Sequence, residues 1–196
     1  MRNLIIEHMQ AGIDLRQTCL ESLQTPLMQA AEQMIHCLQS GGKILACGNG
    51  GSASDAMHFV AELVNRFEIN RPALAAIALV NDASVMTSIA NDFDFNSVFS
   101  RQTEALGRKG DLLLSISTSG NSKNVLKAMQ TASNLGMTTI ALTGHDGGAM
   151  VKFETLSTSI HIDCASTARV QEMHITCLHI LCSIIDHRMF SISQLL

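Results

Sequence analysis

Apolar residues recur at intervals of three and four positions through residues 1–40, which is the spacing of an amphipathic helix. The first such stretch covers residues 3–22. A second begins at Thr25-Pro26, because proline suits the first turn of a helix, and ends at Gly41-Gly42. The pattern predicts a pair of N-terminal helices, and we expect their apolar faces to pack between subunits of an oligomer.

Beyond this pair, short apolar runs of strand length alternate with helical patterns. The runs cover residues 43–47, 73–80, 111–116, 138–143 and 157–163. Such alternation predicts a parallel sheet whose strands are joined by right-handed crossovers through helices. We therefore expect one α/β domain over residues 41–190, followed by a short tail at 191–196.

Two of the predicted helices have clear limits. Asn81-Asp82 is a capping signal for the helix after the second run, and residues 90–93 should end that helix in a loop. The last helix, over residues 167–189, is the longest and is apolar on more than one side.

A glycine-rich turn, Gly48-Asn49-Gly50-Gly51-Ser52, connects the first predicted strand to a helix. A helix N-terminus exposes N–H groups without carbonyl partners, and its dipole favours negative charge. The spacing matches neither the dinucleotide fingerprint nor the P-loop. The turn is a candidate cradle for phosphate or sugar oxygens, although a purely structural glycine turn would read the same way.

A second turn, Ser117-Thr118-Ser119-Gly120-Asn121-Ser122, joins the third predicted strand to its helix. Ligands bind open α/β sheets at the carboxyl ends of the strands. Helix capping and turn formation explain one or two of the four hydroxyl groups but not all of them. This turn is therefore a candidate phosphate site.

Titratable side chains occur at helical spacing in two of the predicted helices. His58 and Glu62 are four residues apart, so they share a helix face and could bind a metal, exchange protons or simply form a surface hydrogen bond. In the last helix, Gln171, His174 and His179 lie along roughly one face. For any single histidine in such a helix, a buried side chain with its hydrogen bonds made is commoner than a metal ligand.

Composition and charge narrow the possible functions. Of the 196 residues, 15% are charged and 46% hydrophobic, and the mean hydropathy of +0.21 suggests apolar surface hidden in an oligomer. The net charge of -4 and the absence of a Lys/Arg cluster argue against nucleic-acid binding. No apolar run reaches the length of a bilayer span and no leader is recognisable, so we expect no membrane partner and a cytoplasmic location. The six cysteines form no CxxC and should be reduced core thiols.

Five motifs occur in order between about residues 41 and 186. They read CGNGGSASDAMHF-x-x-E, IANDF-x-FN-x-VFSRQ, GD-x-L-x-x-ISTSGNS-x-NV, ALTG-x-DGG and ARVQEMHI-x-x-LH. Together they resemble the phosphoheptose isomerase family, which belongs to the sugar isomerase (SIS) domain class. The resemblance implies a single SIS domain with a flavodoxin-like, five-stranded parallel sheet flanked by helices. It also implies a homotetramer with active sites at subunit junctions.

The same resemblance implies an activity and its residues. The expected reaction converts sedoheptulose 7-phosphate to D-glycero-D-manno-heptose 7-phosphate through an enediol, the first step toward the ADP-heptose of lipopolysaccharide core. Glu62 and His179 would be catalytic. Zinc, one ion per subunit, would be held by His58, Glu62, Gln171 and His179. The family's substrate positions fall on Asn49, Gly50, Gly51, Glu62, Asn91, Asp92, Ser117, Thr118, Ser119, Ser122 and Gln171.

The sequence differs from some family members at one position, and a second function is compatible with most of the motifs. Some family members carry an acidic residue where this chain has Ala168. The rival is a non-catalytic SIS-domain adaptor similar to the proteins that associate with the bacterial replication initiator. Those relatives share the glycine turn and the tetramer but lack the acid/base pair, which Glu62 and His179 supply here.

Overall fold

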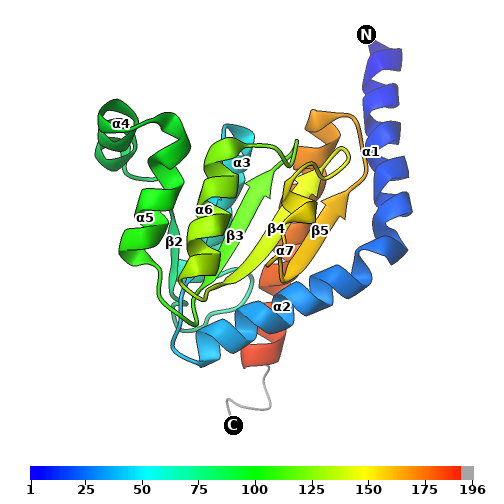
Figure 1. The fold of residues 1–196 in the computed structure, drawn as a ribbon. Coiled ribbons are helices and arrows are strands. Elements are labelled where there is room, and N and C mark those ends of the chain that lie inside the picture. Colours follow the sequence, from blue (N-terminus) through cyan, green and yellow to red (C-terminus); the bar gives the residue numbers. More distant parts are fainter. Residues whose placement is uncertain (191–196) are drawn as a thin grey trace.

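A computed structural model describes residues 1–190, and the predicted tail at 191–196 lies outside the described residues. Five parallel strands form one sheet in the order β2-β1-β3-β4-β5, which is the flavodoxin-like order (Figure 1). The strands are β1 (Ile44–Gly48), β2 (Ala76–Ala78), β3 (Leu112–Ser117), β4 (Thr138–Gly144) and β5 (Thr158–Ile162). This confirms the predicted fold class.

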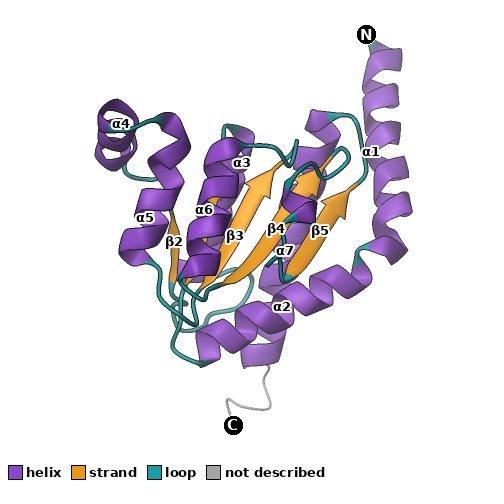
Figure 2. Cartoon of the chain, viewed as in Figure 1, coloured by secondary structure: helices purple, strands orange, loops and turns teal. Residues whose placement is uncertain are grey.

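Helices cover both faces of the sheet, with α6 on one side and α3 and α7 on the other (Figure 2). The helices are α1 (Arg2–Ser22), α2 (Gln24–Gln39), α3 (Gly51–Val64), α4 (Ala83–Asp92), α5 (Val98–Leu106), α6 (Lys123–Asn134) and α7 (Thr167–Phe190), with 3-10 turns at Phe95–Ser97 and Met150–Lys152. Side chains of β1 and β3 alternate between two hydrophobic cores. One core includes α2, α3 and α7, and the other includes α5 and α6.

One predicted limit was wrong. Strand β2 keeps only three residues of the predicted 73–80 run, because it lies at the sheet edge and pairs with β1 alone. Upstream of it, the Leu74 N–H donates to the carbonyl of Leu63 in α3 instead of joining the sheet. Helix α4 ends at Asp92, within the stretch 90–93 that was predicted to end it, and its start is capped by Asp82 as predicted.

Helix α1 carries a row of apolar side chains in solvent, and its N-terminus projects beyond the strands (Figure 1). These side chains, each more than half exposed, are Leu4, Ile5, Ile6, Met9, Ile13 and Leu20. No helix in the described part of the chain combines the length and the apolar character needed to cross a membrane. All six cysteines are free and five are buried, in agreement with the prediction of reduced core thiols.

A buried ion pair joins the C-terminal end of α3 to α7. The Nε of Arg71 lies 2.6 Å from Oδ1 of Asp186, and both side chains are almost fully buried. The same guanidinium donates to the carbonyls of Glu62 at 2.7 Å and Leu63 at 2.9 Å. A carboxylate of α7 thus neutralises an arginine that donates to two of the last carbonyls of α3, which have no partner within the helix.

We predict that Arg71→Met destabilises the fold by about 3–5 kcal/mol, because it leaves Asp186 buried without a counter-charge. The double variant Arg71→Met/Asp186→Leu should be more stable than the single variant, since it removes both charges. Urea unfolding at fixed protein concentration measures the free energy of unfolding. The exposed Arg66 gives the control Arg66→Met, expected within about 0.5 kcal/mol of the parent. An Arg71→Met variant as stable as this control would contradict the prediction.

Candidate active site

The β1–α3 turn needs two of its glycines for different reasons. Gly50 has φ +54°, in the left-handed region that favours glycine. A Cβ on Gly51 would lie 2.1 Å from Nε2 of Gln171, so the α7 amide packs directly on the backbone at the start of α3. Helix α3 has no side-chain cap, and the N–H groups of Ser52, Ala53 and Ser54 already donate to the carbonyls of Asn49 and Gly50. What this turn offers an anion is therefore mainly the positive end of the helix dipole.

The β3–α6 turn gathers three of the four predicted hydroxyl groups. Oγ of Ser117 lies 2.9 Å from Oγ of Ser122 and 3.4 Å from Oγ of Ser119. The turn closes at Gly120, which has φ +62° and lies so near the carbonyl of Gly147 that no side chain would fit. Since α6 also lacks a side-chain cap, its N-terminal N–H groups and these hydroxyls can bind one anion together.

The two turns lie side by side because β1 and β3 are neighbouring strands, with Gly48 opposite Ile116. They are also joined by two hydrogen bonds between Asn49 and Asn124. Asn124 was not among the predicted site residues. Its place in a family motif was visible, but nothing in the sequence indicates a partner 75 residues away.

Helices α3 and α7 bring three predicted residues together. Nε2 of His58 lies 3.2 Å from Oε1 of Glu62 and 3.0 Å from Nε2 of His179. The ring of His179 lies between those of His58 and Phe67, with centroids 5.0 Å and 5.4 Å away. Sequence reasoning missed Phe67, whose role depends on α7 packing against the segment after α3.

The donor set of this cluster suits zinc in kind. Two imidazole nitrogens on a tetrahedral zinc ion, each at about 2.0–2.1 Å, are about 3.3 Å apart, close to the His58–His179 separation. His58 is the central member, since it contacts both Glu62 and His179. As placed within residues 1–190, however, no group of three or more His, Cys, Asp or Glu side chains has the geometry to hold a metal ion.

Other predicted residues lie outside this cluster. The Gln171 amide rests on Gly51, and His58 lies about two turns further along α3. Asn91 donates to Asp92 at 2.8 Å, and both residues are exposed at the end of α4. Within one chain, α4 packs chiefly on α5 and on the 3-10 turn Phe95–Ser97.

Asp55, one turn before His58 on α3, is a titratable residue that sequence reasoning missed. Its Oδ2 is buried without a hydrogen-bond partner. Burial raises the pKa of Asp55 to about 6, and the nearby His58 opposes this shift. A carboxyl group that changes charge near neutral pH therefore lies beside the cluster.

The structure separates His174 from the face shared by Gln171 and His179, which corrects the predicted stripe. The side chain of His174 is fully buried, and neither ring nitrogen has a hydrogen-bond partner. Positions 174 and 179 differ by five residues, so they point about 140° apart around the helix. Burial lowers the pKa of His174 to about 4.

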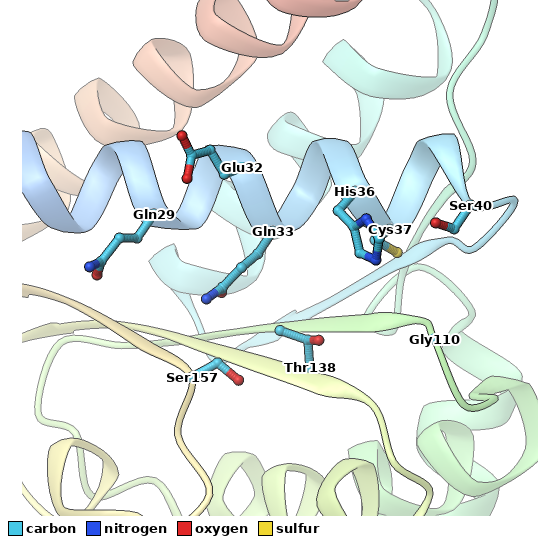
Figure 3. A pocket seen from close by; sticks show the side chains of 9 residues that line it. All are labelled: Gln29, Glu32, Gln33, His36, Cys37, Ser40, Gly110, Thr138 and Ser157. Carbon is cyan, nitrogen blue, oxygen red and sulfur yellow. The ribbon is translucent and has the colours of Figure 1, made fainter.

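The pocket in Figure 3, of about 540 Å³, lies away from these residues. It is bounded by α2 and by residues at or just before the amino ends of β3, β4 and β5, such as Gly110, Thr138 and Ser157. No predicted site residue lines it.

Comparison with known proteins gives consistent similarities. The SIS domain model matches residues 7–144. The phosphoheptose isomerase of Shewanella halifaxensis is 51% identical over 97% of this chain and 95% of its own length, and that of Chromohalobacter salexigens is 49% identical over 97% of each. The solved phosphoheptose isomerase of Neisseria gonorrhoeae has a TM-score of 0.89 at 45% identity, covering 94% of this chain and 98% of that one. The Francisella tularensis structure has a TM-score of 0.91 at 39% identity, covering 94% and 97%.

We predict that His174 makes the protein sensitive to acid. The unfolded chain binds a proton at this residue below pH 6.5, whereas the folded chain does so only below about pH 4. Stability is therefore lost as the pH falls through this interval, by up to about 3 kcal/mol. Urea unfolding at several pH values should show a smaller loss in His174→Gln than in the parent. The exposed-site control His36→Gln should follow the parent, and equal losses in all three proteins would contradict the prediction.

Proposed function

The chain belongs to the phosphoheptose isomerase family of SIS-domain proteins, and from this we propose that it converts sedoheptulose 7-phosphate to D-glycero-D-manno-heptose 7-phosphate. Such an enzyme supplies heptose for lipopolysaccharide core and acts in the cytoplasm. The observation that carries the proposal is the contact of both Glu62 and His179 with Nε2 of His58, beside two turns suited to binding anions.

The isomerisation requires proton transfers at two carbons and two oxygens of the sugar. A base removes a proton from C1 of the ketose while the C2 carbonyl oxygen gains one, which gives the enediol. The C1 hydroxyl then loses its proton and C2 gains one, which gives the aldose. Glu62 is the proposed base at carbon, and His179, held between two rings, is the proposed group that moves protons at oxygen.

The substrate phosphate is proposed to bind at the β3–α6 turn. Ser117, Ser119 and Ser122 present clustered hydroxyls there, and Thr118 lies between the first two. The uncapped N-terminus of α6 adds N–H groups and a favourable dipole. The sugar would then extend toward the Asn49-Gly50-Gly51 turn and Gln171.

Zinc is proposed as the cofactor, held by His58, Glu62 and His179. Family resemblance adds Gln171 as a fourth ligand, although in this structure its amide rests on Gly51 and is not part of the cluster. When bound, zinc would polarise the substrate carbonyl as a Lewis acid. A carboxylate that ligates a metal is a weaker base, so the two roles of Glu62 compete. The adjoining Asp55 places a second carboxyl group near the same imidazole.

A homotetramer is proposed because α1 presents a long apolar surface, which a stable protein normally covers. Asn91 and Asp92 of α4 would then contribute to an active site at a junction between subunits. The alternative of a non-catalytic adaptor is less well supported, because such a protein has no need for Glu62 and His179 to meet.

We predict that Glu62→Gln and His179→Gln each lower kcat for sedoheptulose 7-phosphate by about 10²–10⁴-fold, the usual size of a general acid–base contribution. A coupled assay of product formation measures the rate. The control His36→Gln changes an exposed histidine of α2 and should leave kcat unchanged. Near-normal rates in both variants would show that the proposed acid/base pair is wrong.

Metal analysis of the purified protein should find about one zinc ion per chain, because the proposed ligands form one site. His58→Ala removes the central member of the cluster and should lower the zinc content to near zero. His8→Ala, on α1, should retain the metal. Equal metal content in all three proteins would exclude this site.

Sedimentation equilibrium should give the mass of four chains. Ile13→Glu places a charge within the apolar surface of α1, and we expect it to shift the protein toward smaller species. Gln17→Glu adds the same charge at an exposed polar position of that helix and is the matched control. A monomeric parent, or an unchanged mass in Ile13→Glu, would contradict the proposed packing.

A further inference from the structure

Asn49 and Asn124 form a reciprocal pair of amides between the two anion-binding turns. Nδ2 of Asn49 donates to Oδ1 of Asn124 at 2.9 Å, and Nδ2 of Asn124 donates to Oδ1 of Asn49 at 2.8 Å. Asn49 belongs to the β1–α3 turn and Asn124 to the first turn of α6. Among the described residues, these are the only side-chain hydrogen bonds that connect the two turns.

The side-chain oxygen of Asn124 already accepts two hydrogen bonds. Its side chain is 3% exposed, and its Oδ1 also accepts from the N–H of Val125 at 3.0 Å. Nδ2 and Oδ1 of Asn49 each make one bond to Asn124, which fixes the orientation of the Asn49 amide. Each of these atoms keeps one further hydrogen-bonding position, so Asn49 can offer its side chain to a ligand only in the orientation that the pair fixes.

We propose that Asn124 is a positioning residue, which fixes the distance between the phosphate turn and the sugar turn through its amide pair with Asn49. This inference rests on the proposed function, because it requires one ligand to contact both turns. The two turns belong to separate strand–helix units. The β1–β3 pairing fixes the relative position of the strands, but not that of the loops that follow Gly48 and Ser117. The amide pair supplies the missing connection.

The placement matters because a phosphosugar is anchored at one end and reacts at the other. A misplacement of about 1 Å between anchor and reacting group can cost a rate factor on the order of 10². Inorganic phosphate, in contrast, occupies only the β3–α6 turn. Loss of the amide pair should therefore lower kcat/KM for the sugar phosphate more than it lowers the affinity for inorganic phosphate.

Asn124→Asp is the variant that tests this. A carboxylate keeps the acceptor for the Val125 N–H, so the start of α6 is preserved. It loses the donor to Asn49, so one of the two bonds of the pair is lost and a carboxylate oxygen faces Oδ1 of Asn49 instead. We expect kcat/KM for sedoheptulose 7-phosphate to fall by about tenfold or more. The added charge in the first turn of α6 should raise the inhibition constant of inorganic phosphate, but by a smaller factor than the fall in kcat/KM.

The control Asn134→Asp makes the same chemical change at the exposed end of α6 and should leave both quantities unchanged. Asn49→Ala, Asn124→Ala and the double variant complete the test. If the two amides act as one unit, the double variant loses no more kcat/KM than the more impaired of the two single variants. The inference is overturned if phosphate affinity and kcat/KM fall by the same factor, if kcat/KM falls less than about threefold, or if the two alanine losses add.

Binding calorimetry separates this inference from the proposed function. A parent protein that turns over no sedoheptulose 7-phosphate would refute the proposed activity, while the affinities for that sugar phosphate and for inorganic phosphate would still be compared in the parent and in Asn124→Asp. A selective loss of sugar-phosphate affinity supports the positioning role. If the parent binds neither ligand, or if both affinities change alike in Asn124→Asp, the inference fails.

Discussion

The parallel packing of α3 against α7 is the constraint on which the proposed chemistry depends. Three contacts follow one another in the same order along both helices: Gln171 on Gly51, His179 on His58, and Asp186 on the arginine that holds the end of α3. A shift of one helix by a single turn, about 5.4 Å, would break all three. The buried Arg71–Asp186 pair fixes this alignment, because neither charge can be left without the other in the interior.

The site divides into two parts with different physical character. At the carboxyl ends of β1 and β3, backbone N–H groups, hydroxyls and amides offer fixed dipoles to an anion. Along α3 and α7, titratable groups lie close enough to exchange protons, and burial holds the Asp55 carboxyl near the middle of the pH scale. The first part is suited to holding a phosphosugar and the second to reacting with it, so the relative position of the two parts decides the activity.

Much of this arrangement could be predicted from the sequence, because strand runs, glycine turns and helical spacing are local signals. The last helix was predicted within one residue of its observed limits, and the flavodoxin-like sheet was confirmed. What could not be predicted depends on partners distant in sequence: the short β2, the amide pair across 75 residues, Phe67 beside His179, and the burial of His174. The stripe that joined His174 to His179 failed because α7 is apolar on several sides, so its sequence does not identify the face that meets the sheet.

The brevity of β2 also affects how the molecule behaves in a crowded solution. A sheet edge with a long run of unpaired backbone groups is a template on which foreign strands can add and begin aggregation. Here the outermost strand offers three residues, and the chain beyond them turns away to bond with α3 or to begin α4. The chain leaves the sheet on both sides of β2, so the strand is shorter than the eight residues predicted. The edge available for fibril-like growth is shorter for the same reason.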